Sequence, residues 1–195
     1  MNKNFIIAFE GLDGTGKTKF SNLLKQALEE NNISTIIWKI DSHSRITLRQ
    51  KNSPLLSFKY YIKSIKNRIN NNSRKNNIII FDRYLYTALG YRTLRNNERI
   101  TFLLNYELRK LHKILIKPEI VFLCKTTEEL RKKNIYQKKN IDFLDIDSLN
   151  KKNINFWNNF YTFIDNKNFY SLDTSLHESK VLENMLLIVK EHYNN

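Results

Sequence analysis

The residues best suited to chemistry form a short glycine-rich segment near the start of the chain. Residues 11–18 read Gly-Leu-Asp-Gly-Thr-Gly-Lys-Thr, which matches the pattern G-x-x-x-x-G-K-S/T of a phosphate-binding loop. In such a loop, backbone N–H groups close around polyphosphate oxygens, the lysine contacts the terminal phosphates, and the last hydroxyl reaches a metal ion. Three of the chain's four glycines lie in this segment, so a fortuitous match is a poor explanation. The sequence predicts a nucleoside triphosphate site formed by Gly11, Asp13, Gly14, Thr15, Gly16, Lys17 and Thr18.

A second polar group follows an apolar run. Residues 78–81 are Ile-Ile-Ile-Phe, and Asp82 and Arg83 come directly after them. Side chains at the carboxyl end of a strand face the ligand in an open parallel sheet. We therefore expect Asp82 to hold Mg²⁺ or its water shell beside the Thr18 hydroxyl, and Arg83 to bind phosphate oxygens through two parallel hydrogen bonds. The alternative is a surface Asp-Arg pair that caps the next helix, and the phosphate loop upstream favours the metal site.

Short apolar runs predict the elements that position these residues. They occur at residues 4–9, 34–39, 77–81, 119–123 and 168–172. Helix-like stretches separate them, which is typical of a parallel sheet covered on both faces. We predict one α/β domain over residues 1–195, with the three-layer P-loop NTPase fold and a five-stranded parallel sheet. Two S/T-x-x-E patterns, at 126–129 and 175–178, predict helix starts.

Composition narrows the class of protein. The net charge is +14, but the basic residues are spread along a chain rich in Asn and Ile, as AT-rich coding would produce. We interpret them as a solvated basic surface and do not expect nucleic acid as a partner. No apolar run reaches the roughly 18 residues of a membrane span, and the first strand begins too early for a signal peptide. The single cysteine, Cys124, excludes a disulfide within the chain. We expect a cytoplasmic protein.

The two polar segments together resemble the thymidylate kinase family. The matching segments are residues 9–18 and 82–91. Members of this family are P-loop kinases that transfer the γ-phosphoryl group of ATP to dTMP. The resemblance implies ATP and Mg²⁺ as cofactors, a nucleoside monophosphate as substrate, and a homodimer. Gly14 stands at a loop position that is basic in some members, so the chain resembles the bacterial-type subset.

The resemblance also implies roles for single residues at the acceptor site. Asp13 is expected near the acceptor sugar and Arg83 at the acceptor phosphate. Tyr91 is expected to crowd the 2′ position and so to favour deoxyribose. Phe58 is expected to stack on the thymine base, and Thr87, within the second matching segment, is a further candidate substrate contact.

A polar, weakly periodic stretch at residues 134–146 is interpreted as a lid over the phosphates, although an ordinary surface loop fits equally well. In the bacterial-type subset the cation that faces the transferred phosphoryl group comes from the lid. The candidates here are Arg131, Lys138 and Lys139. Our predicted catalytic residues are Lys17, Asp82, Arg83 and Arg131.

These patterns favour in-line phosphoryl transfer from MgATP to a nucleoside monophosphate, with dTMP as the first choice. One alternative is a kinase of the same fold that acts on another acceptor, such as a deoxynucleoside, another nucleotide or a small metabolite. A more distant alternative is a nucleotide-dependent switch that binds nucleic acid. The match at residues 82–91 argues against the switch, which needs no acceptor site.

Overall fold

Strands and helices alternate along the chain in the computed structural model. It describes residues 4–39, 54–72, 78–95, 106, 109–111, 113, 115, 117–141, 143–164 and 168–193, and only the backbone of residues 54–58, 72, 95, 143 and 144. The strands are β1 (Phe5–Glu10), β2 (Thr35–Lys39), β3 (Ile78–Asp82), β4 (Ile120–Lys125) and β5 (Phe169–Asp173). The helices are α1 (Lys17–Glu30), α3 (Pro54–Asn72), α4 (Leu85–Arg95), α6 (Glu128–Tyr136), α7 (Phe143–Asp147), α8 (Lys151–Ile164) and α9 (Glu178–Tyr193).

The five strands form one parallel sheet in the order β2-β3-β1-β4-β5. This confirms the predicted fold class, and each predicted strand is present within two residues of its expected bounds. β1 occupies the centre, and its Phe9 pairs with Asp82 of β3. The segments that leave the carboxyl ends of β1 and β3 are therefore neighbours.

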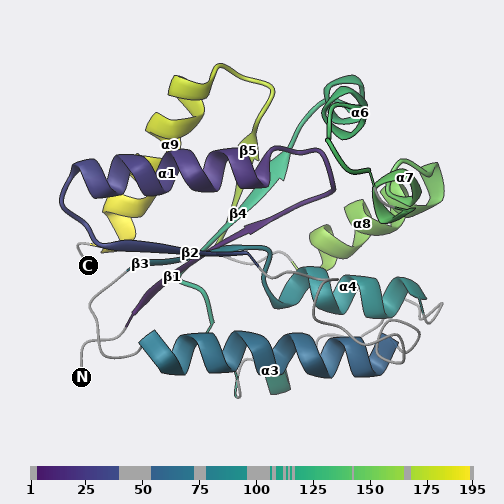
Figure 1. Cartoon of the computed structure of the whole chain (residues 1–195), viewed down its shortest axis with the longest axis horizontal. Helices are drawn as coiled ribbons and strands as arrows, with labels where there is room; N and C mark the ends of the chain where they lie inside the picture. The colour runs from purple at the N-terminus through teal and green to yellow at the C-terminus, as the bar shows by residue number, and fades with distance from the viewer. Residues whose placement is uncertain are drawn as a thin grey trace.

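Helices cover both faces of the sheet. Figure 1 shows α1 and α9 on one side and α3 and α4 on the other. Alternate residues of β1 serve the two layers: Ile7 and Phe9 pack in the core with α1 and α9, whereas Ile6 and Ala8 pack in the core with α3, α4 and α8. Strands buried on both faces explain the nearly continuous apolar runs in the sequence. Within the described residues, no helix has both the length and the hydropathy required to cross a bilayer.

Both predicted helix starts lie slightly too early in the sequence. The N-cap of α6 is Thr127, not Thr126, because the Thr127 side chain accepts a hydrogen bond from the Leu130 N–H at 3.3 Å. The helix α9 begins only at Glu178. Ser175 does not cap it, because its N–H and hydroxyl both donate to Oδ1 of Asp173, at 3.0 and 2.5 Å.

The helices α4 and α8 approach closely at Gly90. A Cβ atom at this position would overlap Cζ3 and Cη2 of Trp157 and would lie 3.2 Å from Cε1 of Phe160. Trp157 has little freedom to move, because it is buried and its ring contacts those of Tyr91 and Tyr161. Gly90 therefore sets the distance between the two helices.

We predict that Gly90→Ala lowers the free energy of unfolding by about 1–3 kcal/mol through overpacking, although alanine is the better helix former. Urea unfolding followed by circular dichroism measures the loss. In a Trp157→Phe background, which lacks the outer ring atoms, Gly90→Ala should cost less. An equal loss in both backgrounds would show that this clash is not the cause.

Candidate active site

The predicted phosphate loop joins β1 to α1. The N-cap residue of α1 is Gly16, with φ of 82°, and no side chain caps the helix. The first N–H groups of α1 therefore lack a side-chain acceptor, and they carry the positive end of the helix dipole. Such a helix start binds anions, phosphate groups above all. The backbone of the loop thus fits a polyphosphate.

The loop lysine is buried, and its ammonium group is bound to carbonyl oxygens of the loop. Lys17 has 5% of its surface exposed, and its Nζ donates to the carbonyl oxygens of Gly11 at 2.9 Å and Leu12 at 2.5 Å. Burial is the main cause that lowers the pKa of the Lys17 ammonium to about 8, and the positive charge of Arg83 is the second. Nearby carboxylates oppose this shift.

A hydroxyl and a carboxylate meet where the metal was predicted. The hydroxyl of Thr18 donates to Oδ2 of Asp82 at 2.5 Å. Thr18 lies in the first turn of α1, and Asp82, which is buried, ends β3. Hard oxygen ligands of this kind suit Mg²⁺, which uses few protein ligands and completes its shell with water and phosphate oxygens. The two side chains therefore fit the predicted ion.

Two of the predicted acceptor-site residues, Arg83 and Tyr91, bind the carboxylate of a third, Asp13. Arg83 forms an ion pair with Asp13 through Nη2 and Oδ1, and the Tyr91 hydroxyl donates to Oδ2 of Asp13 at 3.0 Å. Burial alone would raise the Asp13 pKa, but the charges of Arg83, Lys17 and Lys138 and the Tyr91 hydrogen bond outweigh it and lower the pKa to about 2. Asp13 is therefore ionised and holds the arginine beside the loop.

The helix α6 packs directly on the phosphate loop. Asn134 donates from Nδ2 to the carbonyl oxygen of Gly14 at 2.8 Å. Gly14 has φ of 81°, and a Cβ atom there would lie 2.6 Å from the carbonyl oxygen of Arg131 and 2.9 Å from Cγ1 of Ile135. Position 14 therefore has no room for a side chain while α6 lies in this position.

The candidate lid cations lie beside this contact. Arg131 is buried, and its Nη1 donates to the carbonyl oxygens of Ser148 at 3.1 Å and Asp13 at 3.5 Å. Its Nη2 is buried with no hydrogen-bond partner among the described residues. Lys138 forms an ion pair with Asp145, and Lys139 is exposed. The stretch predicted as a lid, residues 134–146, consists in its described part of the end of α6, a turn and most of α7.

Thr87, another predicted substrate contact, has a different partner. Thr87 is buried, and its hydroxyl donates to Oε2 of Glu10. The side chain of Phe58 lies outside the described residues. Sequence reasoning also missed Glu10, Asn134 and Tyr161, which contact the loop or the turn at residues 82–84, here called the arginine turn. Only Glu10 left a signal, an acidic residue at the end of an apolar strand.

We predict that the affinity for metal-free ADP falls as the pH rises above about 8. In that range Lys17 is neutral in the free protein, and binding must restore its proton, because the bound anion favours the charged form. The loss should approach about tenfold per pH unit. Calorimetry in two buffers of different ionisation enthalpy measures both the affinity and the proton uptake. Lys17→Ala should abolish the uptake, whereas Lys25→Ala on the exposed face of the same helix should not; a pH-independent affinity would contradict the prediction.

Comparison with known proteins agrees with this geometry. A family model described as thymidylate kinase matches residues 9–185. The chain is 25% identical over 151 residues to the probable thymidylate kinase of Methanocaldococcus jannaschii, a match that covers 72% of this chain and 76% of that protein. It is 27% identical over 195 residues to probable thymidylate kinase 1 of Saccharolobus solfataricus, which covers 96% of this chain and 97% of that protein. The matched range contains the phosphate loop, the arginine turn and α6, and the chain is therefore a phosphotransferase that belongs to the thymidylate kinase family.

Proposed function

We propose that this protein transfers the γ-phosphoryl group of MgATP to a nucleoside monophosphate, with dTMP as the acceptor. One observation carries the proposal: Asp13 lies inside the phosphate loop and at the same time binds Arg83 and Tyr91. Groups suited to a donor triphosphate and groups suited to an acceptor nucleotide thus share one carboxylate. A nucleotide-dependent switch would need only the first set.

On the donor side, bound MgATP supplies the phosphoryl group and a metal ion that offsets its charge. The N–H groups of residues 13–18 would hold the phosphates, and Lys17 would exchange its bonds to loop carbonyls for phosphate oxygens. Thr18 and Asp82 would hold the ion. Positioning and charge neutralisation account for most of the catalysis in this class of reaction.

On the acceptor side, Arg83 can serve two anions at once. Its ion pair with Asp13 uses one Nη atom, and a guanidinium carries five N–H donors. The remaining donors would bind the acceptor phosphate. Lys59 and Lys63, both exposed on α3, are candidates for a second phosphate contact. Tyr91, whose ring packs 5.0 Å from that of Trp157, would exclude a 2′-hydroxyl group.

A different acceptor is the second candidate, and one observation favours it. In the first turn of α4, Ala88 has no polar group that could bind a base edge, and the Thr87 hydroxyl donates its proton to Glu10. A thymine base would then be recognised by shape and stacking, which discriminate less sharply than hydrogen bonds.

We further propose that residues 134–146 form a lid that excludes water during transfer, in a protein made of one domain. The hydrogen bond between Asn134 and Gly14 supports this, since a movement of α6 would break or shift a bond to the phosphate loop. The homodimer that the family resemblance implies and the cytoplasmic location expected from the composition remain predictions. The segments 54–72 and 98–116 are our candidates for the dimer interface; the first is α3, and the second lies largely outside the described residues.

A coupled ADP-release assay with MgATP over the common nucleosides and nucleoside monophosphates tests the proposal. We expect dTMP to give the highest kcat/KM. Preference for another acceptor would support the second candidate. Nucleotide binding with slow hydrolysis that no acceptor stimulates would contradict both.

We predict that Lys17→Ala and Arg83→Ala each lower kcat by about a hundredfold or more, because each removes a cation that meets transition-state charge. Phe58→Ala should instead raise the acceptor KM, since an aromatic stack contributes about 1–3 kcal/mol to base binding. Steady-state kinetics with dTMP measure both effects. Lys25→Ala is the control, and an Arg83→Ala enzyme with nearly normal kcat would refute the role given to Arg83.

A further inference from the structure

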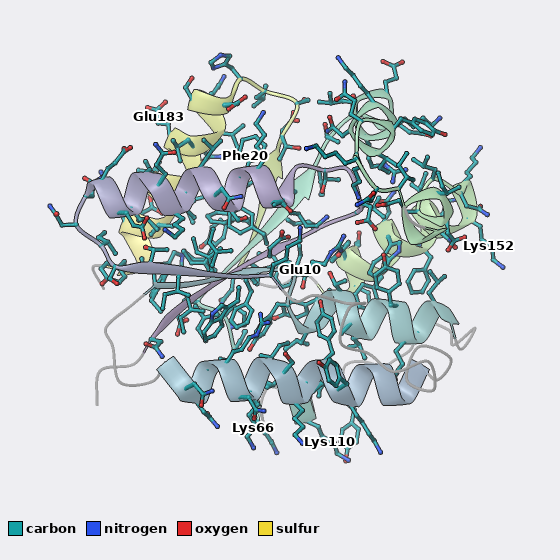
Figure 2. All side chains as sticks on the ribbon, in the orientation of Figure 1. Glu10, Phe20, Lys66, Lys110, Lys152 and Glu183 are labelled. Atoms are coloured by element: carbon teal, nitrogen blue, oxygen red, sulfur yellow. The ribbon has the colours of Figure 1, made fainter. Side chains whose placement is uncertain are left out.

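The proposed reaction gives no role to the buried carboxylate of Glu10. Glu10, at the end of β1, is fully buried. Figure 2 shows it in the interior between α1 and α4, whereas Lys66 and Lys152 lie at the periphery. Burying a carboxylate is costly unless its oxygens are hydrogen-bonded, and even then it seldom adds net stability. The position of Glu10 therefore requires an explanation other than stability.

The oxygens of Glu10 receive hydrogen bonds from two sides. Oε1 accepts from the N–H groups of Tyr84 at 2.9 Å and Thr87 at 3.3 Å. Oε2 accepts from the Thr87 hydroxyl and from the Tyr161 hydroxyl, the latter at 3.3 Å. Four donors and no acceptor match an ionised carboxylate. Burial raises the pKa of Glu10 above its usual value, and the hydrogen bonds from Thr87 and Tyr84 together with the charge of Arg83 offset only part of this rise.

The first of these bonds fixes a strained turn. Arg83 has φ of 78°, a conformation that costs a non-glycine residue about 1–3 kcal/mol unless its surroundings impose it. The Arg83 N–H donates to the carbonyl oxygen of Phe9 at 3.0 Å, and the Tyr84 N–H donates to Glu10. Both peptide groups that flank the Arg83 Cα are thus attached to consecutive residues of β1. This attachment directs the guanidinium toward Asp13.

A second bond reaches the phosphate loop. The Tyr161 hydroxyl, which donates to Glu10, accepts a hydrogen bond from the Gly11 N–H at 3.1 Å. Gly11 is the first residue of the loop, and its carbonyl oxygen accepts a hydrogen bond from Nζ of Lys17. One carboxylate therefore orders the arginine turn directly and the entry of the loop through Tyr161.

We propose that Glu10 is a positioning residue for phosphoryl transfer, which holds Arg83 and, through Tyr161, Gly11 so that the acceptor and donor groups meet. The inference rests on the proposed function for its kinetic consequence, but the placement of Arg83 can be measured without turnover. Glu10 itself contacts neither substrate in this account.

Two substitutions distinguish the effect of the length of the Glu10 side chain from the effect of its charge. Glu10→Asp keeps the charge and withdraws the carboxylate from Tyr84, whereas Glu10→Gln keeps the length and removes the charge. We expect Glu10→Asp to lower kcat by about tenfold to a hundredfold, as a displacement near 1 Å does, with a smaller change in the KM for ATP. Glu10→Gln should stay within about threefold of the wild type, because its amide oxygen still accepts from both N–H groups.

The matched control is Thr93→Val. Thr93 is a buried threonine on α4, the helix that carries Thr87, and its hydroxyl donates to the Leu89 carbonyl oxygen at 2.9 Å. Thr93→Val should lower thermal stability and leave kcat unchanged. If Glu10→Asp lowers stability but leaves kcat unchanged, Glu10 has only a structural role and the proposal is wrong. A larger kcat loss in Glu10→Gln than in Glu10→Asp would show that charge matters and would also overturn the proposal.

The carboxyl ¹³C signal of Asp13 reports the position of Arg83 independently of activity. With its pKa near 2, wild-type Asp13 should not titrate between about pH 4 and 7, whereas loss of the arginine should bring its pKa into that range. We expect titration in Glu10→Asp and none in Glu10→Gln or Thr93→Val. If the wild type lacks acceptor-dependent turnover but the signals behave in this way, the proposed function fails and the positioning role stands. An Asp13 signal that does not titrate in Glu10→Asp refutes the positioning of Arg83.

Should Glu10→Asp not fold, Tyr161→Phe provides a second test. It keeps the ring and removes only the hydroxyl between Gly11 and Glu10. We expect MgADP to bind at least about threefold more weakly in calorimetry, because a buried N–H loses its partner. Unchanged affinity would exclude the link from Glu10 to the loop.

Discussion

The parallel pairing of β1 with β3 is the constraint on which the site depends. Because Phe9 lies opposite Asp82, the loop after one strand and the turn after the other begin at the same level of the sheet. The Thr18–Asp82 hydrogen bond and the bonds from the arginine turn back to β1 follow from this register. A slip by one residue would reverse the face of every side chain on the slipped strand. It would also separate the Thr18 hydroxyl from the Asp82 carboxylate and disrupt the core.

Charge balance explains why so many ionisable groups tolerate burial at one place. The carboxylates of Glu10, Asp13 and Asp82 face the cations of Lys17 and Arg83. Each cation is partnered within the protein, by loop carbonyls or by a carboxylate. A bound triphosphate would replace existing partners of Lys17 and add negative charge to this cluster, in which both cations already have partners. In the proposed reaction, the metal ion and a cation of the proposed lid would balance that charge.

The sequence predicted what local patterns determine and missed what long-range contacts determine. The loop, the strands and their layering follow from glycine spacing and apolar runs within about ten residues. The Thr126–Thr127 pair offered two adjacent caps, and only backbone geometry selects the second. The Tyr161 hydroxyl meets the Gly11 N–H across 150 positions, and no periodicity encodes such a pair. Glu10 falls inside the matching segment 9–18, but its hydrogen-bond donors lie 74 to 151 positions away, so the pattern assigned it no role.

The packing of α6 on the loop decides where a catalytic cation can originate. A basic side chain at position 14 would occupy the space of the α6 backbone at Arg131 and of the Ile135 side chain, so the loop cannot supply the cation in this arrangement. Arg131 instead joins the Asp13 carbonyl oxygen to that of Ser148, which precedes α8. Since α8 also carries Tyr161, segments that follow β4 bind the phosphate loop at Gly11, Asp13 and Gly14. A rearrangement that frees Arg131 for a phosphate would break its bond to the Asp13 carbonyl oxygen, whereas the bond between Tyr161 and Gly11 does not depend on Arg131.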